Sequence, residues 1–222
     1  MEICSPAPVP STPVSPALIP LSGGLEEVCA AGPRDMAGAL AFILSRSGPG
    51  TGRGIALTVT RAWLAEQGRP YGPGLAWFGR REGLVLVTTR TEADCLWAME
   101  QALRSGGLDA VLGGIEGADL TRTRRLEFAA RDGNASGILL RTRTGDLSAA
   151  RRRWRISTLA GPSDPHDPRA PGRLALRAEL TRSRTERPGV WMLEQDDETD
   201  RLRLADRLAG DGPGPISRPH AA

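Results

Sequence analysis

The chain has 222 residues with 29 basic and 26 acidic side chains, and every basic residue is an arginine. Without lysine the chain has no Schiff base, no pyridoxal anchor and no phosphate-loop lysine. Its 40% apolar and 25% charged residues are typical of a globular domain, which excludes wholesale disorder and a membrane bundle. A chain of this length can bury a core without disulfides or a structural metal.

The cysteines and histidines form no recognisable metal or disulfide pattern. Cys4, Cys29 and Cys95 are odd in number and share no ligand spacing, and His166 and His220 lie in loop-like sequence. We therefore expect no metal, no cofactor and a reducing, cytoplasmic compartment. The N-terminus lacks the basic start of a signal peptide, and no apolar stretch approaches the ~20 residues of a membrane-spanning helix.

The two ends of the chain differ in composition from its middle. Six prolines among serines and threonines predict a disordered arm over residues 1–20, which we expect to be removable without unfolding the domain. Residues 196–222 are acidic and then rich in glycine and proline, which predicts a loose tail with one short helix around Arg201–Leu208. The folded domain is therefore expected to span residues 21–195.

Strand and helix signals alternate in the first part of this domain. The expected strands are a short apolar stretch around Val28, then Gly54–Thr60, Gly83–Thr88, Leu108–Ile115 and Gly137–Leu140. The expected helices begin at Asp35, at Thr91 with Asp94 as its capping partner, and at Asp119 or Thr121. This alternation with short connections predicts a parallel sheet between helices. The continuous apolar run of Gly83–Thr88 is typical of a strand that is covered on both faces.

After Arg141 the pattern changes to strict alternation. Trp154, Ile156 and Thr158 alternate with polar residues, the segment around Leu174–Leu180 does the same, and Val190–Leu193 adds a last strand. Alternation without intervening helices predicts half-exposed strands joined by hairpins. The predicted fold class is α/β, with a mostly parallel central sheet flanked by helices and ending in antiparallel strands.

Five segments in this order resemble the ImuA family, whose members are also described as SulA-like or RecA-like. They are Gly72–Leu75, Cys95–Arg104, Arg124–Ala130, Ser148–Arg155 and Pro188–Trp191. The resemblance covers about residues 21–195 and implies a RecA-like domain. It also implies an accessory protein of a damage-inducible mutagenesis cassette for translesion DNA synthesis. Its implied partners are an inactive Y-family polymerase-like adaptor, ImuB, and an error-prone replicative-type polymerase, DnaE2.

The elements of a RecA-type ATPase are absent from their expected places. In the turn after the first strand, Gly32 and Gly38 are separated by five residues rather than four, lysine and hydroxyl are missing, and Asp35 would repel phosphate. A metal-binding acid is expected at the end of the strand Leu108–Ile115, but Gly113–Gly114 occupies that position. A water-activating glutamate is expected after the second strand, but Thr60–Arg61 occupies that position. We therefore predict a pseudo-ATPase that is not an enzyme.

Arginine is concentrated in one segment, because residues 121–190 hold 16 arginines against 7 acidic residues. The candidate nucleic-acid or partner-binding residues are Arg141, Arg143, Arg151, Arg152, Arg153 and Arg155. Guanidinium groups neutralise phosphates, and Trp154 among them could stack on an unpaired base. Alternatively, Trp154 belongs to the core with Ile156, and the arginines form a solvated face or a strip that docks a protein.

The predicted function is a non-catalytic accessory role in error-prone translesion synthesis and SOS mutagenesis. The protein would connect polymerase components and contact single-stranded DNA. The alternative is a SulA-like inhibitor of cell division that acts by protein–protein binding. That role requires a protein-binding surface and no affinity for DNA.

Overall fold

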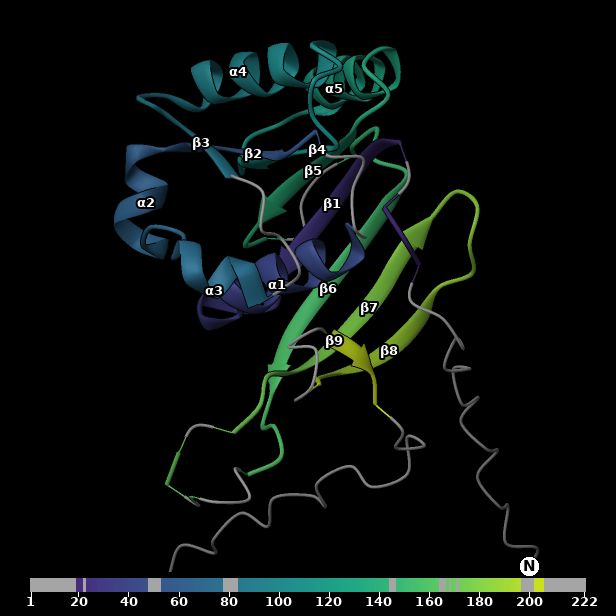
Figure 1. The fold of residues 1–222 in the computed structure, drawn as a ribbon. Helices are drawn as coiled ribbons and strands as arrows, with labels where there is room; N and C mark the ends of the chain where they lie inside the picture. Colours follow the sequence, from purple (N-terminus) through teal and green to yellow (C-terminus); the bar gives the residue numbers. More distant parts are fainter. Residues whose placement is uncertain are drawn as a thin grey trace, which may run out of the picture.

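The computed structural model describes residues 19–21, 23–47, 53–77, 84–143, 147–163, 167, 169–170, 172–196 and 202–205. Its strands form one nine-stranded sheet in the order β3-β2-β4-β5-β1-β6-β7-β8-β9 (Figure 1). The strands that pair in parallel are β1 (Gly24–Ala30), β2 (Ile55–Thr60), β3 (Leu84–Thr89), β4 (Ala110–Gly114), β5 (Ser136–Arg141) and β6 (Arg152–Leu159). Antiparallel pairing continues the sheet through β7 (Ala175–Ser183), β8 (Gly189–Gln195) and β9 (Leu202–Leu204). The predicted fold class is confirmed.

Helices cover both faces of the parallel part of the sheet (Figure 1). One face carries α1 (Met36–Arg46), which follows a short 3₁₀ turn at Pro33–Asp35, together with α2 (Arg61–Gln67) and α3 (Gly72–Trp77). The other face carries α4 (Glu92–Arg104) and α5 (Leu120–Asp132). Among the described residues, no helix combines the length and the apolar composition needed to cross a membrane.

The starts of α4 and α5 are set by local side chains. The Thr91 hydroxyl accepts the backbone N–H of Asp94 at 3.1 Å and donates to the Asp94 carboxylate at 2.8 Å. Asp119, rather than Thr121, caps α5 by accepting the backbone N–H of Arg122 at 2.8 Å. These bonds satisfy N–H groups that lack a partner within the first helical turn. The N-cap predicted at Thr91 is therefore confirmed, and its predicted partner Asp94 bonds to the Thr91 hydroxyl.

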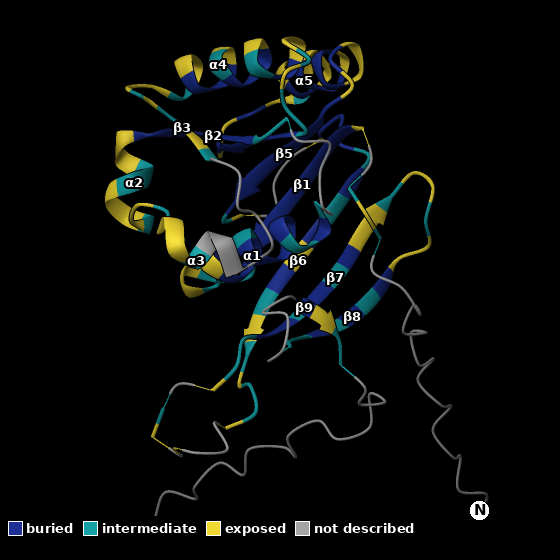
Figure 2. Cartoon of the chain, viewed as in Figure 1, coloured by how far each residue is buried: buried dark blue, intermediate teal, exposed yellow. Residues whose placement is uncertain are grey.

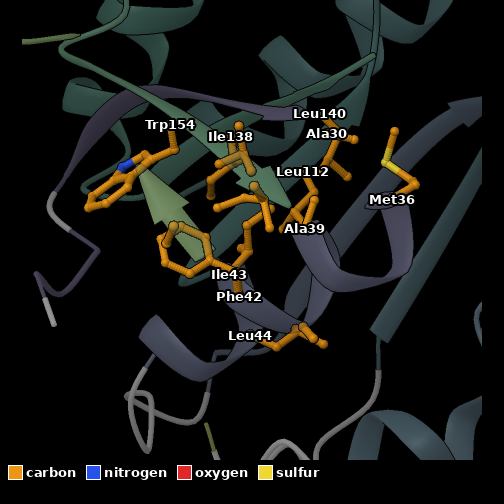
Figure 3. Packing of buried hydrophobic residues seen from close by; sticks show 14 of the residues in the cluster. Ala30, Met36, Ala39, Phe42, Ile43, Leu44, Leu112, Ile138, Leu140 and Trp154 are labelled. Atoms are coloured by element: carbon orange, nitrogen blue, oxygen red, sulfur yellow. The ribbon is translucent and has the colours of Figure 1, made fainter. Parts of the chain in front are cut away.

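Three aromatic rings form the centre of the core on the α1 face. The Trp154 ring lies 5.0 Å from the Phe42 ring and 5.1 Å from the Trp191 ring, centroid to centroid, in tilted contacts. Figure 2 shows the buried centre of the sheet, and Figure 3 shows Trp154 and Phe42 among the aliphatic side chains of this layer. Trp154 is 0% exposed, so it is a core residue and offers no ring to a base.

Two strand predictions are wrong in detail. Leu84–Thr89 is the outer edge strand β3 and not a strand covered on both faces, and Val85 is 53% exposed. An apolar run does not distinguish a central strand from an edge strand, since both are compatible with it. Strand β6 pairs in parallel with β1 and antiparallel with β7, so the antiparallel part of the sheet begins one strand later than the alternation around Trp154 predicts.

The ends of the domain also differ from expectation. The strand β9 lies within the segment predicted as a helix at Arg201–Leu208, so the sheet extends past residue 195. Most of the predicted arm lies outside the described residues, as does most of the tail. Ile19 packs against the core, and the carbonyls of Ile19 and Pro20 accept hydrogen bonds from Arg46. The boundary at residue 20 therefore cuts through contacts, and a deletion should stop before Ile19.

Candidate functional site

The turn after β1 is fastened to β6. Ala31 donates its N–H to the Ile156 carbonyl at 2.8 Å, and the Asp35 carboxylate accepts the Thr158 N–H at 2.8 Å. A Cβ at Gly38 would lie 2.8 Å from a Leu176 methyl group, so glycine is needed here for α1 to pack on the sheet. The residues of this turn are thus explained by packing and by the bond of Asp35 to β6.

The position expected for a metal-binding acid, at the end of β4, is closed by neighbouring side chains. A Cβ would lie 2.6 Å from the Met99 sulfur at Gly113 and 2.7 Å from the indole nitrogen of Trp63 at Gly114. Any larger residue would have to displace these neighbours. Among the residues described, no group of three or more His, Cys, Asp or Glu side chains is arranged to hold a metal ion.

Two acids near this edge are occupied by the backbone. Glu92 accepts the N–H groups of Glu116 and Gly117 at 3.0 and 3.1 Å. The Glu116 carboxylate accepts the backbone N–H and the hydroxyl of Thr142 at 2.6 and 2.9 Å. Both carboxylates hold loops in place.

Two cysteines lie in the parallel part of the fold. Cys29 and Cys95 are both buried. Burial raises the pKa of both thiols, that of Cys29 to about 11. Neither is therefore a thiolate at neutral pH, and nucleophilic chemistry at these residues is disfavoured.

Arg152 belongs to an ion-pair network under the α1 face. The Glu26 carboxylate is 2% exposed and binds Arg46 and Arg152, each at 2.9 Å, and accepts the indole N–H of Trp154 at 3.1 Å. Arg152 also binds the Glu186 carboxylate. Burial lowers the pKa of the Arg46 guanidinium, and the Glu26 charge opposes this shift. The network connects α1, β1, β6 and the segment between β7 and β8.

A second network lies on the opposite face of β1. Glu27 is 0% exposed and binds Arg153 at 2.6 Å and Arg141 at 3.4 Å. The Glu127 carboxylate binds Arg151 at 2.6 Å and accepts the Leu25 N–H at 2.6 Å. Adjacent glutamates at positions 26 and 27 therefore neutralise arginines on both sides of the sheet.

The candidate arginines accordingly fall into two groups. Arg141 and Arg152 are buried, and Arg153 is held by Glu27 with 16% of its side chain exposed. Arg143 and Arg155 are exposed, and the Arg151 side chain is 37% exposed. The prediction of one open basic strip does not hold for Arg152, which shares the apolar face of β6 with Trp154.

A signal for this division was present in the sequence. Residues 152, 154 and 156 share one parity on a strand, so Arg152 should have been assigned to the same face as Trp154 and Ile156. The acidic pair Glu26–Glu27 stands in an otherwise apolar strand, and buried carboxylates require partners. Sequence reasoning used neither observation.

The outer face of β6, β7 and β8 carries Arg155 on a mixed surface. Arg155 lies opposite Glu179, which is ion-paired with Arg177 at 2.6 Å and lies opposite Val190 on β8. In Figure 1, α4 and α5 lie over the parallel part of the sheet, and β7 to β9 extend beyond them. This part of the sheet therefore presents half-exposed side chains that a partner can reach.

A cavity of about 390 Å³ lies between α1 and the α2–α3 segment. Its lining is mainly apolar and includes Met36, Leu40, Leu44, Trp63 and Tyr71. A nucleotide requires phosphate-binding N–H groups or cations at one end of its site. The cation Arg69 also lines the cavity, but the rest of the lining is mainly apolar, which disfavours a nucleotide over an apolar group.

Comparisons with known proteins give a consistent set of relatives, although no family model matches the chain. The chain is 33% identical over 209 residues to the curated Protein ImuA of Caulobacter vibrioides, covering 87% of this chain and 79% of that protein. It is 36% identical over 89 residues to the cell division inhibitor SulA of Edwardsiella piscicida, covering 40% of this chain and 53% of that protein. The crystal structure of SulA from Pseudomonas aeruginosa is 21% identical, with a TM-score of 0.39, and the match covers 52% of this chain and 96% of that one.

Proposed function

The chain belongs to the ImuA family, and on that premise we propose that it is a non-catalytic accessory protein of damage-induced, error-prone DNA synthesis. The observation that carries this proposal is the similarity to ImuA, which extends over 87% of the chain. The role in mutagenesis comes from the resemblance to the family. The proposed partners are the adaptor ImuB and the polymerase DnaE2, and the proposed compartment is the cytoplasm, where these polymerases meet DNA.

The proposal that the protein is a pseudo-ATPase is supported by two sites. Asp35 is held by the Thr158 N–H in the turn after β1, and the chain has no lysine for a phosphate. Gly113 and Gly114 have no space for an acid. A working nucleotide site needs a cation for the phosphates and an acid for magnesium together.

The surface proposed to contact single-stranded DNA or a polymerase partner comprises Arg143, Arg155 and the exposed part of Arg151. Their exposure makes them accessible to phosphate. Arg141, Arg152 and Arg153 are left out of this surface because their guanidinium groups bind Glu26 and Glu27 within the fold. A solvated face without a ligand is the alternative for the exposed group.

The alternative function, a SulA-like inhibitor of cell division, has narrower support. The match to the SulA of Edwardsiella piscicida covers 40% of this chain, against 87% for ImuA. An inhibitor of this kind would bind a protein and have no need of exposed arginines that face DNA. The two functions predict different phenotypes.

The test is a gene deletion in the native host followed by DNA damage. The accessory role predicts that induced mutation frequency falls and returns on complementation, with no effect on filamentation. Reduced filamentation with unchanged mutation frequency would favour the division inhibitor and contradict the proposal.

A second experiment tests the pseudo-ATPase directly. Calorimetry with ATP and magnesium should detect no binding. Micromolar affinity or magnesium-dependent turnover would contradict the pseudo-ATPase.

A further inference from the structure

Two large aromatic side chains are exposed on the helices that cover one face of the sheet. Trp97 on α4 is 63% exposed and Phe128 on α5 is 58% exposed. Figure 2 shows the exposed outer sides of these two helices at the surface of the molecule. Single exposed apolar residues are ordinary, but here two exposed rings lie on helices that pack side by side.

The relation between the rings follows from an ion pair that joins the helices. Arg125 of α5 binds Glu100 of α4 at 2.7 Å. Trp97 precedes Glu100 by three residues, and Phe128 follows Arg125 by three. Both helices return the chain between parallel strands and therefore run in the same direction (Figure 1). At 1.5 Å per residue, the rings flank the ion pair and are offset by about 9 Å along the helix axes.

The charges around the rings are arranged as a neutralised centre with a basic rim. Glu100 is buried and is shared by Arg104 at 3.1 Å and Arg125 at 2.7 Å, whose side chains are 50% and 63% exposed. Arg124 and Arg131 are exposed one turn before and one turn after Phe128. The acids Asp94 and Asp132 are also exposed on these two helices, so their outer surface carries four arginines against Glu100, Asp94 and Asp132.

We infer that this α4–α5 surface, formed by Trp97, Arg104, Arg124, Arg125, Phe128 and Arg131, binds a segment of a partner protein that presents apolar side chains flanked by carboxylates. Aromatic residues and arginine are enriched at protein interfaces, and tryptophan and arginine are enriched among their strongest contacts. The inference goes beyond the proposed function and uses none of the β6 arginines.

Two other occupants fit this surface less well. A second copy of the chain would bring arginines against arginines, at a cost in electrostatic free energy. A nucleic acid would need free cations along its path, but the two arginines at the centre already share the Glu100 carboxylate. An acidic protein segment can place its apolar side chains on the rings and its carboxylates on Arg124 and Arg131.

The experiment measures fluorescence anisotropy with the full-length protein and three labelled probes. The first probe is a 15-residue peptide with leucine and phenylalanine at helical spacing and Asp and Glu elsewhere. The second probe has lysine at every acidic position, and the third is oligothymidine. We expect the acidic peptide to bind at least about tenfold more tightly than the basic one.

Variants locate the site. Trp97→Ala and Phe128→Ala should each weaken binding of the acidic peptide about tenfold. The double variant Arg124→Glu/Arg131→Glu should also weaken it and leave both rings in place. Tyr71→Ala, which removes a ring that is 73% exposed near α3, is the matched control and should change nothing.

Four results would overturn the inference. The acidic and basic peptides could bind the wild type equally, or the acidic peptide could bind neither form of the protein. The Tyr71 control could lose as much affinity as the Trp97 variant. Finally, oligothymidine could displace the peptide and depend on Trp97, which would make this surface a nucleic-acid site. Thermal melts equal to the wild type establish that each variant is folded.

Discussion

Arginines that surround β1 and arginines on the outer surfaces have the same chemistry and opposite environments. Arg46, Arg141 and Arg152 are buried against Glu26 and Glu27, whereas Arg143 and Arg155 are exposed. The difference is set by two adjacent glutamates in one central strand. An arginine-rich segment of a sequence therefore does not by itself indicate a basic surface, because acids elsewhere in the fold can bury and neutralise its side chains.

The inner group should dominate stability. Replacing Glu26 by alanine would leave Arg46 and Arg152 with one fewer carboxylate in a buried site and remove the acceptor of the Trp154 indole N–H. We expect a loss of about 3–5 kcal/mol in the free energy of unfolding, measured by urea denaturation. The control Glu179→Ala breaks a half-exposed pair and should cost at most about 1 kcal/mol. Equal losses of unfolding free energy in the two variants would contradict the distinction between buried and exposed ion pairs.

Glu186 offers a pH-dependent test at the margin of the inner group. Its hydrogen bonds from Arg152 lower the pKa of this carboxyl to about 2, from an ordinary value of 4.5. A lowered pKa in the folded state contributes stability above pH 4.5, and this contribution is lost as the pH falls from 4.5 to 2.

The variant Glu186→Gln should therefore be less stable than the wild type at pH 7 by about 2 kcal/mol. The difference should narrow as the pH falls through that window, because the wild-type carboxyl then takes up its proton. Thermal melts of both proteins at several pH values measure it. A stability difference between the two proteins that stays constant with pH would mean that the Arg152–Glu186 ion pair adds nothing to stability.

The fold class, the caps at Thr91 and Asp119 and the core position of Trp154 can be predicted from the sequence, because each depends on local spacing or on the period of a strand. The ion-pair partners of the arginines cannot be predicted from the sequence. Glu26 and Arg152 are 126 residues apart and meet only through the parallel pairing of β1 with β6. No local pattern in the sequence predicts that pairing.

The surface that holds the exposed aromatic residues likewise cannot be predicted from local sequence patterns. Helices beginning at Thr91 and at Asp119 or Thr121 are predicted from the sequence, and the buried stripe of α4 at Leu96, Met99 and Leu103 follows from its spacing. That Trp97 and Phe128 belong to one surface depends on the ion pair between Arg125 and Glu100 across the two helices. Helix–helix neighbours of this kind are fixed by the strand order, which no local pattern contains.

The most direct test of the central claim, that outer arginines bind while inner arginines hold the fold, is the salt dependence of binding to oligothymidine. In Arg143→Ala/Arg155→Ala, the melting temperature should be unchanged and the slope of log K against log salt should decrease by about 1.4, since each lost phosphate contact removes about 0.7. The matched pair Arg61→Ala/Arg90→Ala, also exposed, should keep the wild-type slope. An unchanged slope in the first variant, or an equal decrease in both, would contradict the account.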